Sequence, residues 1–167
     1  DIGLRALRHL SQDYLLAANP AAHLDAAHSL YERADSLTDR LAALRWITHY
    51  EAVEKREAVL ADFYSRWQHE ALVVNQWLTV QATRPEVDCV DSVRALMTHP
   101  AFDWRNPNKL RALIGAFASA NPIAFHREDG AGYRLMGEVI ERLQASNPQI
   151  AARMLAPMTR WRRYAVG

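Results

Sequence analysis

The chain has 167 residues and a mass of 19.0 kDa, half of its residues are hydrophobic, and its formal net charge is +1. A chain of this length can bury one continuous core, and its near-neutral charge argues against binding to nucleic acid through bulk charge. No apolar run approaches the roughly 18 residues needed to cross a bilayer. The composition therefore predicts one domain, residues 1–167, with no nucleic-acid partner and no membrane partner.

Two features of the sequence indicate its setting. The only cysteine, Cys89, excludes an internal disulfide and any multi-cysteine metal site. The sequence starts at Asp1, and the residues that follow lack the basic and then apolar pattern of a secretion signal. We therefore expect a fragment of a larger protein in a reducing cytoplasm.

The first clear helix signal lies at Ser36. Its hydroxyl oxygen can accept an amide hydrogen bond at a helix start, and Asp39 occupies the capping-box position. The leucines that follow at helical spacing are Leu37, Leu41 and Leu44. This pattern predicts a capped amphipathic helix.

Short helices continue along the chain. Their apolar positions at helical spacing are Leu60, Phe63 and Trp67, then Val73, Trp77 and Val80, then Val90, Val93 and Leu96, and then Leu110, Leu113, Ile114 and Phe117. Asp62 and Arg66 form a favourable pair on the wet face of one helix, and Pro85 ends another helix because it biases Arg84 out of helical geometry. Residues 102–107 are the longest connection without a helix signal. No stretch alternates with period two, so the predicted fold class is all-α.

The C-terminal helix has two faces. At about 100° per residue, the polar and cationic residues on one arc are Gln149, Arg153 and Arg160. The apolar residues on another arc are Ile150, Ala151, Met154, Leu155 and Met158. Pro157 removes the amide that would bond the carbonyl of Arg153, which predicts a bend near Arg153. We expect the apolar arc to pack on the other helices and the polar arc to project outward.

Residues 126–130 combine an imidazole, a guanidinium and two carboxylates, which superficially suggests a site. However, Asp129-Gly130 is a turn dipeptide, and Gly130 and Gly132 permit backbone angles that other residues resist. Carboxylates on adjacent residues point in different directions, so general acid and base roles have little support. We interpret this segment as a turn between helices.

The histidines offer no zinc site of the metallopeptidase type. Such a site needs two histidines one helical turn apart, with a glutamate beside the first. The nearest approach is His69-Glu70, but Val73 stands where the second imidazole would have to be. No other pair of histidines lies three or four residues apart. The sequence therefore predicts no metal ligand and no catalytic residue in this chain.

Several motifs are too particular to be generic helix. They are residues 106–117, Ala120-Asn121-Pro122, Phe125-His126, residues 129–133, residues 34–39, Gln81-Ala82-Thr83, residues 147–151 and Arg163-Tyr164. These motifs are spread from residue 34 to residue 164, so the resemblance extends over most of the chain. They resemble the C-terminal helical domain of bacterial aminopeptidase N, a zinc-dependent enzyme that removes single residues from peptide N-termini.

The resemblance implies both an architecture and a role. The family domain is a curved array of short helical hairpins, similar to an armadillo or HEAT superhelix, that caps the active site and shapes the peptide-access channel. The zinc motif and the Gly-x-Met-Glu-Asn motif, which belong to a separate catalytic domain in the family, are absent here. The fragment alone is therefore expected to be inactive and to hold no cofactor, with zinc in the catalytic domain of a bacterial cytoplasmic enzyme. Its expected partners are that domain of the same polypeptide and peptide substrates.

On the family's pattern, the positions that match Gln149 and Arg153 lie beside the substrate channel, and the position that matches Arg111 lies near it. A guanidinium there could hold peptide carbonyls or a C-terminal carboxylate through two parallel hydrogen bonds. The residues alone leave Arg111 open between an intramolecular ion pair and a substrate contact.

Two other functions are compatible with the residues. One is a free-standing helical-repeat module for protein interactions. The other is a nucleic-acid binder that uses the arginines after Glu141, where no further acidic residue occurs. The family domain continues beyond its arginine–tyrosine pair, whereas this chain stops at Gly167, so we expect the last helices to be missing.

Overall fold

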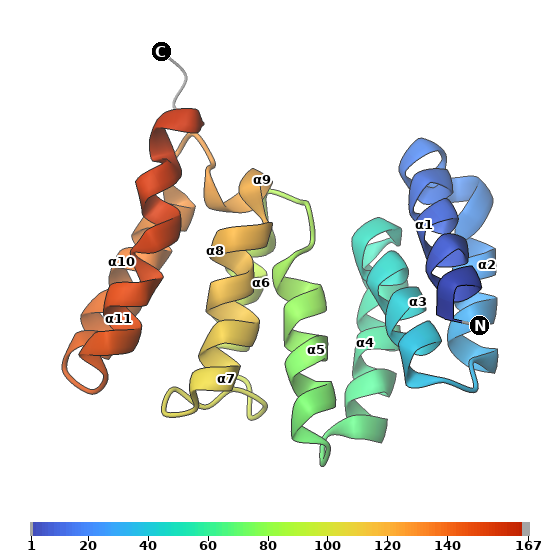
Figure 1. Cartoon of the computed structure of the whole chain (residues 1–167), viewed down its shortest axis with the longest axis horizontal. Coiled ribbons are helices and arrows are strands. Elements are labelled where there is room, and N and C mark those ends of the chain that lie inside the picture. The colour runs from blue at the N-terminus through green and yellow to red at the C-terminus, as the bar shows by residue number, and fades with distance from the viewer. Residues whose placement is uncertain (1, 165–167) are drawn as a thin grey trace. The chain divides into compact units, whose positions relative to one another are not determined.

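The computed structural model describes residues 2–164, and within that part of the chain it contains helices and no strand (Figure 1). The predicted all-α class is therefore confirmed. The chain divides into two compact units, Asp1–His69 and Glu70–Gly167. The expected loss of further helices concerns the chain end at Gly167, which lies outside the described residues.

The first unit contains α1 (Ile2–Ala18), α2 (Pro20–Arg33), α3 (Leu37–Tyr50) and α4 (Val53–Trp67). Helix α3 packs against the other three. Its innermost residues are Ala43, Leu44 and Ile47, which are fully buried. The predicted start of α3 is confirmed, because the backbone N–H of Asp39 donates to the hydroxyl oxygen of Ser36.

Two histidine–carboxylate contacts join the helices of the first unit. Nε2 of His9 lies 2.7 Å from a carboxylate oxygen of Asp39, and Nε2 of His28 lies 2.8 Å from one of Glu51. Burial raises the pKa of both carboxyls, but hydrogen bonds from Ser36 and His9 to Asp39 and from His28 to Glu51 outweigh burial and lower both pKa values below their usual range. Both carboxylates therefore contribute stability when they are ionised.

The second unit contains the remaining helices. They are α5 (Ala71–Ala82), α6 (Cys89–Leu96), α7 (Pro107–Leu110), the π-helix η1 (Arg111–Gly115), α8 (Ala116–Ala120), α9 (Pro122–Phe125), α10 (Ala131–Gln144), α11 (Pro148–Met154) and the 3-10 helix η2 (Ala156–Arg163). Helix α5 packs against α6, α7, η1 and α8, and α10 packs against α6, α9 and α11. The largest fully buried side chains of this unit are Leu78, Leu110, Leu113, Ile114, Phe117, Phe125, Leu135 and Met136.

Asparagine–proline pairs start four of the helices. The capping residues are Asn19, Asn106, Asn121 and Asn147. In each case the side-chain oxygen accepts a hydrogen bond from a backbone N–H in the first turn, and proline occupies the position where an amide would have no partner. Asn121 is buried, and its side-chain nitrogen also donates to the carbonyls of Ala82 at 3.0 Å and Arg84 at 2.7 Å. This contact fixes the end of α5 against the start of α9.

The predicted apolar stripe from Leu110 to Phe117 is buried, but it is not one α-helix. The N–H of Ala116 donates to the carbonyls of Arg111 and Leu113. The carbonyl of Ala112, which an α-helix would pair with that N–H, instead accepts a hydrogen bond at 3.0 Å from the hydroxyl of Thr79, 33 residues earlier in the chain. A hydroxyl on α5 therefore supports the π-helix, and the helical spacing of the sequence carries no sign of it.

The C-terminal helix also departs from its prediction. Helix α11 ends at Met154, and the chain continues as η2, with Pro157 in its first turn. Because a 3-10 helix has three residues per turn, Arg160 does not follow the α-helical arc that the sequence analysis assigned to it. The helix type changes between Met154 and Ala156, and the bend predicted near Arg153 stays a prediction.

We expect Phe117→Ala and Trp77→Ala each to lower the free energy of unfolding by about 3–5 kcal/mol, because both side chains are buried and their loss leaves a cavity. Urea denaturation followed by circular dichroism measures the change. Val87→Ala is the control, since Val87 is 58% exposed in the same unit, and it should leave the midpoint unchanged. Unchanged midpoints for both aromatic variants would contradict the assigned core.

We also expect the first unit to lose stability in acid. A carboxyl whose pKa is lowered by folding contributes stability above its unfolded pKa of about 4, and this contribution is lost as the pH falls through the lower folded value. Asp39→Asn should destabilise the chain at neutral pH and flatten the fall of unfolding free energy below about pH 4. Urea denaturation across a pH series checks both effects, with Asp25→Asn as the control because Asp25 is exposed. An unchanged pH dependence in Asp39→Asn would show that the His9–Asp39 contact contributes nothing.

Candidate functional site

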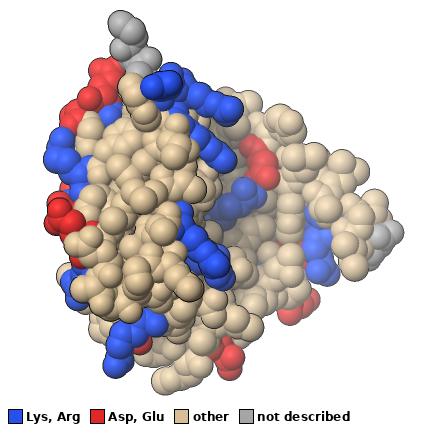
Figure 2. Space-filling view, turned by 60° about the vertical axis from the view of Figure 1, so that its left-hand side comes forward, with Lys and Arg blue, Asp and Glu red and all other residues tan. Residues whose placement is uncertain are grey.

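A cleft of about 1010 Å³ lies on the second unit. Its walls come from α5, α7, η1, α8, α11 and η2. The charged residues that line it are Arg111, Arg153 and Arg160, and none of the described lining residues is acidic. Figure 2 shows basic side chains, drawn in blue, along the face of the molecule turned toward the viewer. The cleft is therefore suited to an anionic ligand or to the carbonyl oxygens of a polar one.

All three residues that the sequence analysis assigned to the channel line this cleft. Arg111 comes from η1, whereas Gln149 and Arg153 come from α11. These helices are far apart in the sequence, so the fold brings the three side chains to one surface. Their predicted contacts with a substrate stay predictions.

Arg111 is held by neutral groups. Its guanidinium donates to the side-chain oxygen of Asn108 at 3.2 Å. The aliphatic stem of Arg111 lies beside Gly115, where an added Cβ would be 3.6 Å from Cγ of the arginine. Within residues 2–164, Arg111 forms no salt bridge with a carboxylate. Its charge is therefore not compensated by an internal ion pair in the described part of the chain.

The two other arginines of the cleft belong to successive helices. Arg153 lies in the last turn of α11 and Arg160 lies in η2, and both side chains are exposed. Exposure keeps a guanidinium hydrated, so each arginine alone is a weak anchor. Together with Arg111, they place three planar guanidinium groups, each with several N–H donors, on the wall of the cleft.

Asn75 adds a polar group that the sequence analysis did not identify. It lies on α5 and lines the cleft. Its side-chain oxygen is buried and accepts no hydrogen bond from the described residues. A buried acceptor without a partner costs free energy. Only the folded structure shows this, because the sequence does not say which asparagine oxygen lacks a donor.

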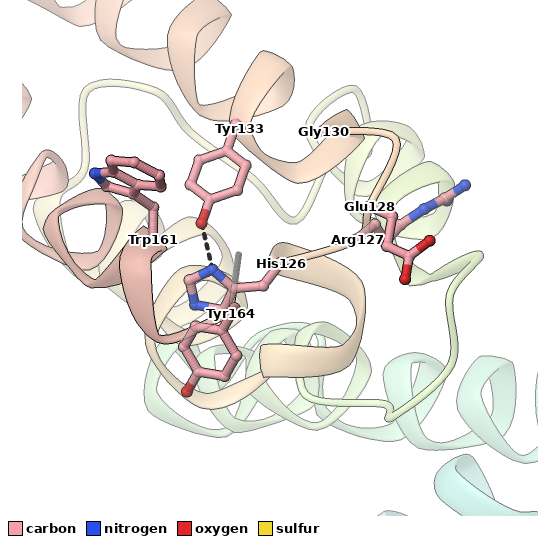
Figure 3. A pocket seen from close by; sticks show the side chains of 7 residues that line it. All are labelled: His126, Arg127, Glu128, Gly130, Tyr133, Trp161 and Tyr164. Atoms are coloured by element: carbon pink, nitrogen blue, oxygen red, sulfur yellow. Dashed lines mark hydrogen bonds between the residues drawn. The ribbon is translucent and has the colours of Figure 1, made fainter. Parts of the chain in front are cut away.

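A second, smaller pocket of about 430 Å³ lies in the same unit (Figure 3). The aromatic residues that line it are His126, Tyr133, Trp161 and Tyr164. The imidazole of His126 stacks on the phenol of Tyr164 at 3.7 Å between ring centroids, with 12° between the planes. Nδ1 of His126 and the hydroxyl of Tyr133 lie 2.5 Å apart and share a hydrogen bond. Burial, together with the charge of Arg160, lowers the pKa of His126, which favours a neutral ring at neutral pH.

The predicted turn at residues 126–130 is confirmed, and it forms one side of this pocket. Gly130 has a φ of 70°, a left-handed conformation that glycine adopts without strain. Gly132 is needed for a different reason from the one predicted, since it lies inside α10 with an ordinary φ. A Cβ at Gly132 would lie 2.2 Å from the carbonyl oxygen of Phe125, so glycine allows α10 to approach α9 closely.

Cys89 is a buried core residue. Its side chain is fully buried, and burial raises the pKa of the thiol to about 11. A thiol is a weak nucleophile when it stays protonated. The structure therefore supports a small buried apolar group rather than a reactive thiol.

Among the described residues, no three or more His, Cys, Asp or Glu side chains gather closely enough to hold a metal ion. His69 and Glu70 precede α5, and Val73 is buried in that helix. No helix in residues 2–164 is long and apolar enough to cross a membrane.

Residues 1–167 match the family described as a domain of unknown function (DUF3458_C) with ARM repeats. The chain belongs to this family, and the predicted armadillo-like array of helices is confirmed by the match. A solved structure of aminopeptidase A from Legionella pneumophila, in complex with aspartic acid, matches 95% of this chain and 19% of its own, with a TM-score of 0.88 and 33% identity.

Three bacterial proteins named aminopeptidase N are similar to nearly the whole of this chain. Aminopeptidase N from Haemophilus influenzae is 44% identical over 164 residues, which are 98% of this chain and 18% of that protein. Aminopeptidase N from Escherichia coli is 36% identical over 98% of this chain and 19% of its own length, and that from Caulobacter vibrioides is 38% identical over 97% and 19%. The predicted similarity to bacterial aminopeptidase N is confirmed, and the chain spans about a fifth of the length of these relatives.

We expect the purified chain to bind no stoichiometric zinc and to release no alanine from an alanine arylamide. No described cluster of side chains has metal-ligand geometry, and none of the described residues that line the cleft is His, Cys, Asp or Glu. Metal analysis after dialysis and an arylamide assay with and without a chelator provide the test. Chelator-sensitive release of alanine by the chain alone would overturn the expectation.

Proposed function

We propose that this chain is a non-catalytic domain of a zinc-dependent aminopeptidase N, in which it caps the active site and forms one wall of the peptide-access channel. The parent enzyme would release N-terminal amino acids from peptides. Bacterial enzymes named aminopeptidase N contain a segment similar to nearly the whole of this chain, which supports the assignment.

One observation carries the channel role. Arg111, Gln149 and Arg153, which the family resemblance predicts to lie at the channel, line one cleft although Arg111 comes from η1 and the other two from α11. The cleft volume of about 1010 Å³ is at the upper end of the roughly 300–1,000 Å³ of ordinary ligand pockets. A ligand longer than a single amino acid is therefore the better fit, and a peptide has that length.

The polar groups of the cleft match the chemistry of a peptide. The guanidinium groups of Arg111, Arg153 and Arg160 can donate to backbone carbonyls or to a C-terminal carboxylate. These contacts bind and orient a peptide, and none of them transfers a proton or attacks a bond.

The zinc of this enzyme class does not fit the described residues, because they contain no group of ligands for a metal ion. On this proposal, zinc is held by another part of the parent polypeptide, and that catalytic part is the main partner of this chain. Location in the bacterial cytoplasm stays a prediction.

The experiment that tests the channel role is Arg153→Ala in the full-length enzyme. The side chain is exposed and lies on the cleft, so its loss should leave folding and metal content unchanged. Loss of one charge-assisted contact of about 1.5–3 kcal/mol should lower kcat/KM for a tripeptide by about ten- to a hundredfold. An alanine arylamide, which has no C-terminal carboxylate, should lose much less.

Two further variants control for charge and structure. Arg153→Lys keeps the charge but not the fork of donors, so it should restore only part of the tripeptide activity. Arg105→Ala removes an exposed arginine of the same unit that does not line the cleft, and it should change neither substrate. Equal losses for both substrates in Arg153→Ala would indicate a structural role. No loss for either substrate would show that Arg153 is a hydrated surface charge.

A further inference from the structure

The 3-10 helix η2 is held by little buried surface. None of its residues is buried, and its main packing partners within the described chain are α8 and the preceding helix α11. Trp161 is 51% exposed, and Tyr164, which follows the helix directly, is 44% exposed. Side-chain burial therefore contributes little to its position, and individual contacts matter more than in α5 or α10.

Different sides of η2 contribute to the cleft and to the aromatic pocket. With three residues per turn, residues i and i+3 lie on one line along the helix. Pro157 and Arg160 form one such pair, and both line the cleft. Trp161 and Tyr164, the residue after the helix, are also three residues apart, and both line the aromatic pocket. The segment formed by η2 and Tyr164 therefore contributes side chains to both the cleft and the aromatic pocket.

The contacts in the aromatic pocket are better defined than those that η2 makes at the cleft. Tyr164 stacks on His126 almost in parallel, and the ring of His126 is itself fixed by its hydrogen bond to Tyr133 of α10 (Figure 3). His126 follows α9, whose core residue Phe125 is fully buried and packs against the rings of both His126 and Tyr133. The stack therefore connects the end of η2 to the core of the unit.

We infer that the Tyr164–His126–Tyr133 contact fastens η2 to the unit and so places the guanidinium of Arg160 on the wall of the cleft. His126 and Tyr164 are positioning residues, and Arg160 is the group that meets the ligand. The inference rests on the proposed function of the cleft, but the attachment of η2 can be measured separately. Arg160 also acts on His126 directly, since its charge contributes to the lowered pKa of the imidazole.

Hydrogen exchange of the full-length protein tests the attachment. Tyr164→Ala should speed exchange in residues 156–164 by about tenfold or more while exchange in α5 and α10 stays unchanged. Tyr164→Phe keeps the ring and should restore slow exchange. His126→Gln is the second variant, because it removes the stack from the other side and should give the same local effect. Tyr14→Ala is the matched control, since Tyr14 is a 72% exposed tyrosine in the other unit.

Two N-acetylated tripeptides, used as inhibitors, test the placement of Arg160. One has a free C-terminal carboxylate and the other has a C-terminal carboxamide. Arg160→Ala and Tyr164→Ala should each weaken inhibition by the carboxylate peptide about tenfold relative to inhibition by the carboxamide peptide. The double variant should show no further loss of inhibition. Unchanged exchange in both Tyr164→Ala and His126→Gln overturns the inference, as does an additive loss in the double variant. If Arg160→Ala leaves both peptides unaffected, the proposed role of Arg160 in the cleft is wrong, whereas the exchange result still decides whether the stack holds η2.

Discussion

The hydrogen bond accepted by the carbonyl oxygen of Ala112 supports the π-helix around which the second unit is arranged. In a regular α-helix this oxygen would accept the N–H of Ala116, and residues 107–120 would continue as one uniform helix. Here the hydroxyl of Thr79 donates to it instead, and the N–H of Ala116 reaches back to Arg111. A side chain of α5 thereby stabilises an inserted residue in the helix packed against it.

This insertion decides which side chains face the core and which face the cleft. Leu113, Ile114 and Phe117 remain buried, while Arg111 and Gly115 line the cleft. The extra residue of a π-helix rotates the residues that follow it relative to those before it. One short segment can therefore bury its apolar side chains and also direct Arg111 and Gly115 toward the cleft. The same helix thus contributes to the hydrophobic core and presents a guanidinium to the cleft.

The sequence predicted the features of this fold that depend on local signals. Ser36 marked the start of α3, the apolar stripe around Leu113 marked a buried helix, and Asp129-Gly130 marked a turn, because each signal acts within one or two turns of chain. The family resemblance added that Arg111, Gln149 and Arg153 belong to one surface, which helical spacing within separate segments does not show.

The features that the sequence missed depend on contacts between distant segments. The π-helix requires the hydroxyl of Thr79, and the aromatic pocket requires Tyr164 to stack on His126. Residues 126–130 of the pocket were interpreted as a turn, and Tyr133 and Tyr164 appeared only within the motifs that resemble the family, so neither observation brought these side chains together. The role of Gly132 was also missed, since only the packed structure shows that a Cβ would collide with the carbonyl of Phe125.

The exposure of the three arginines bears on how the cleft can select a ligand. An exposed guanidinium is hydrated and screened by salt over roughly 8 Å at physiological ionic strength, so an anion gains little from it in open water. The same guanidinium becomes a stronger and more selective donor when water is excluded from around it. The cleft on this unit is open, and its described residues supply the donors but no cover. On the proposed function, a catalytic domain that closes over the cleft would lower the local dielectric, so the affinity for a peptide carboxylate would belong to the assembled channel rather than to this unit alone.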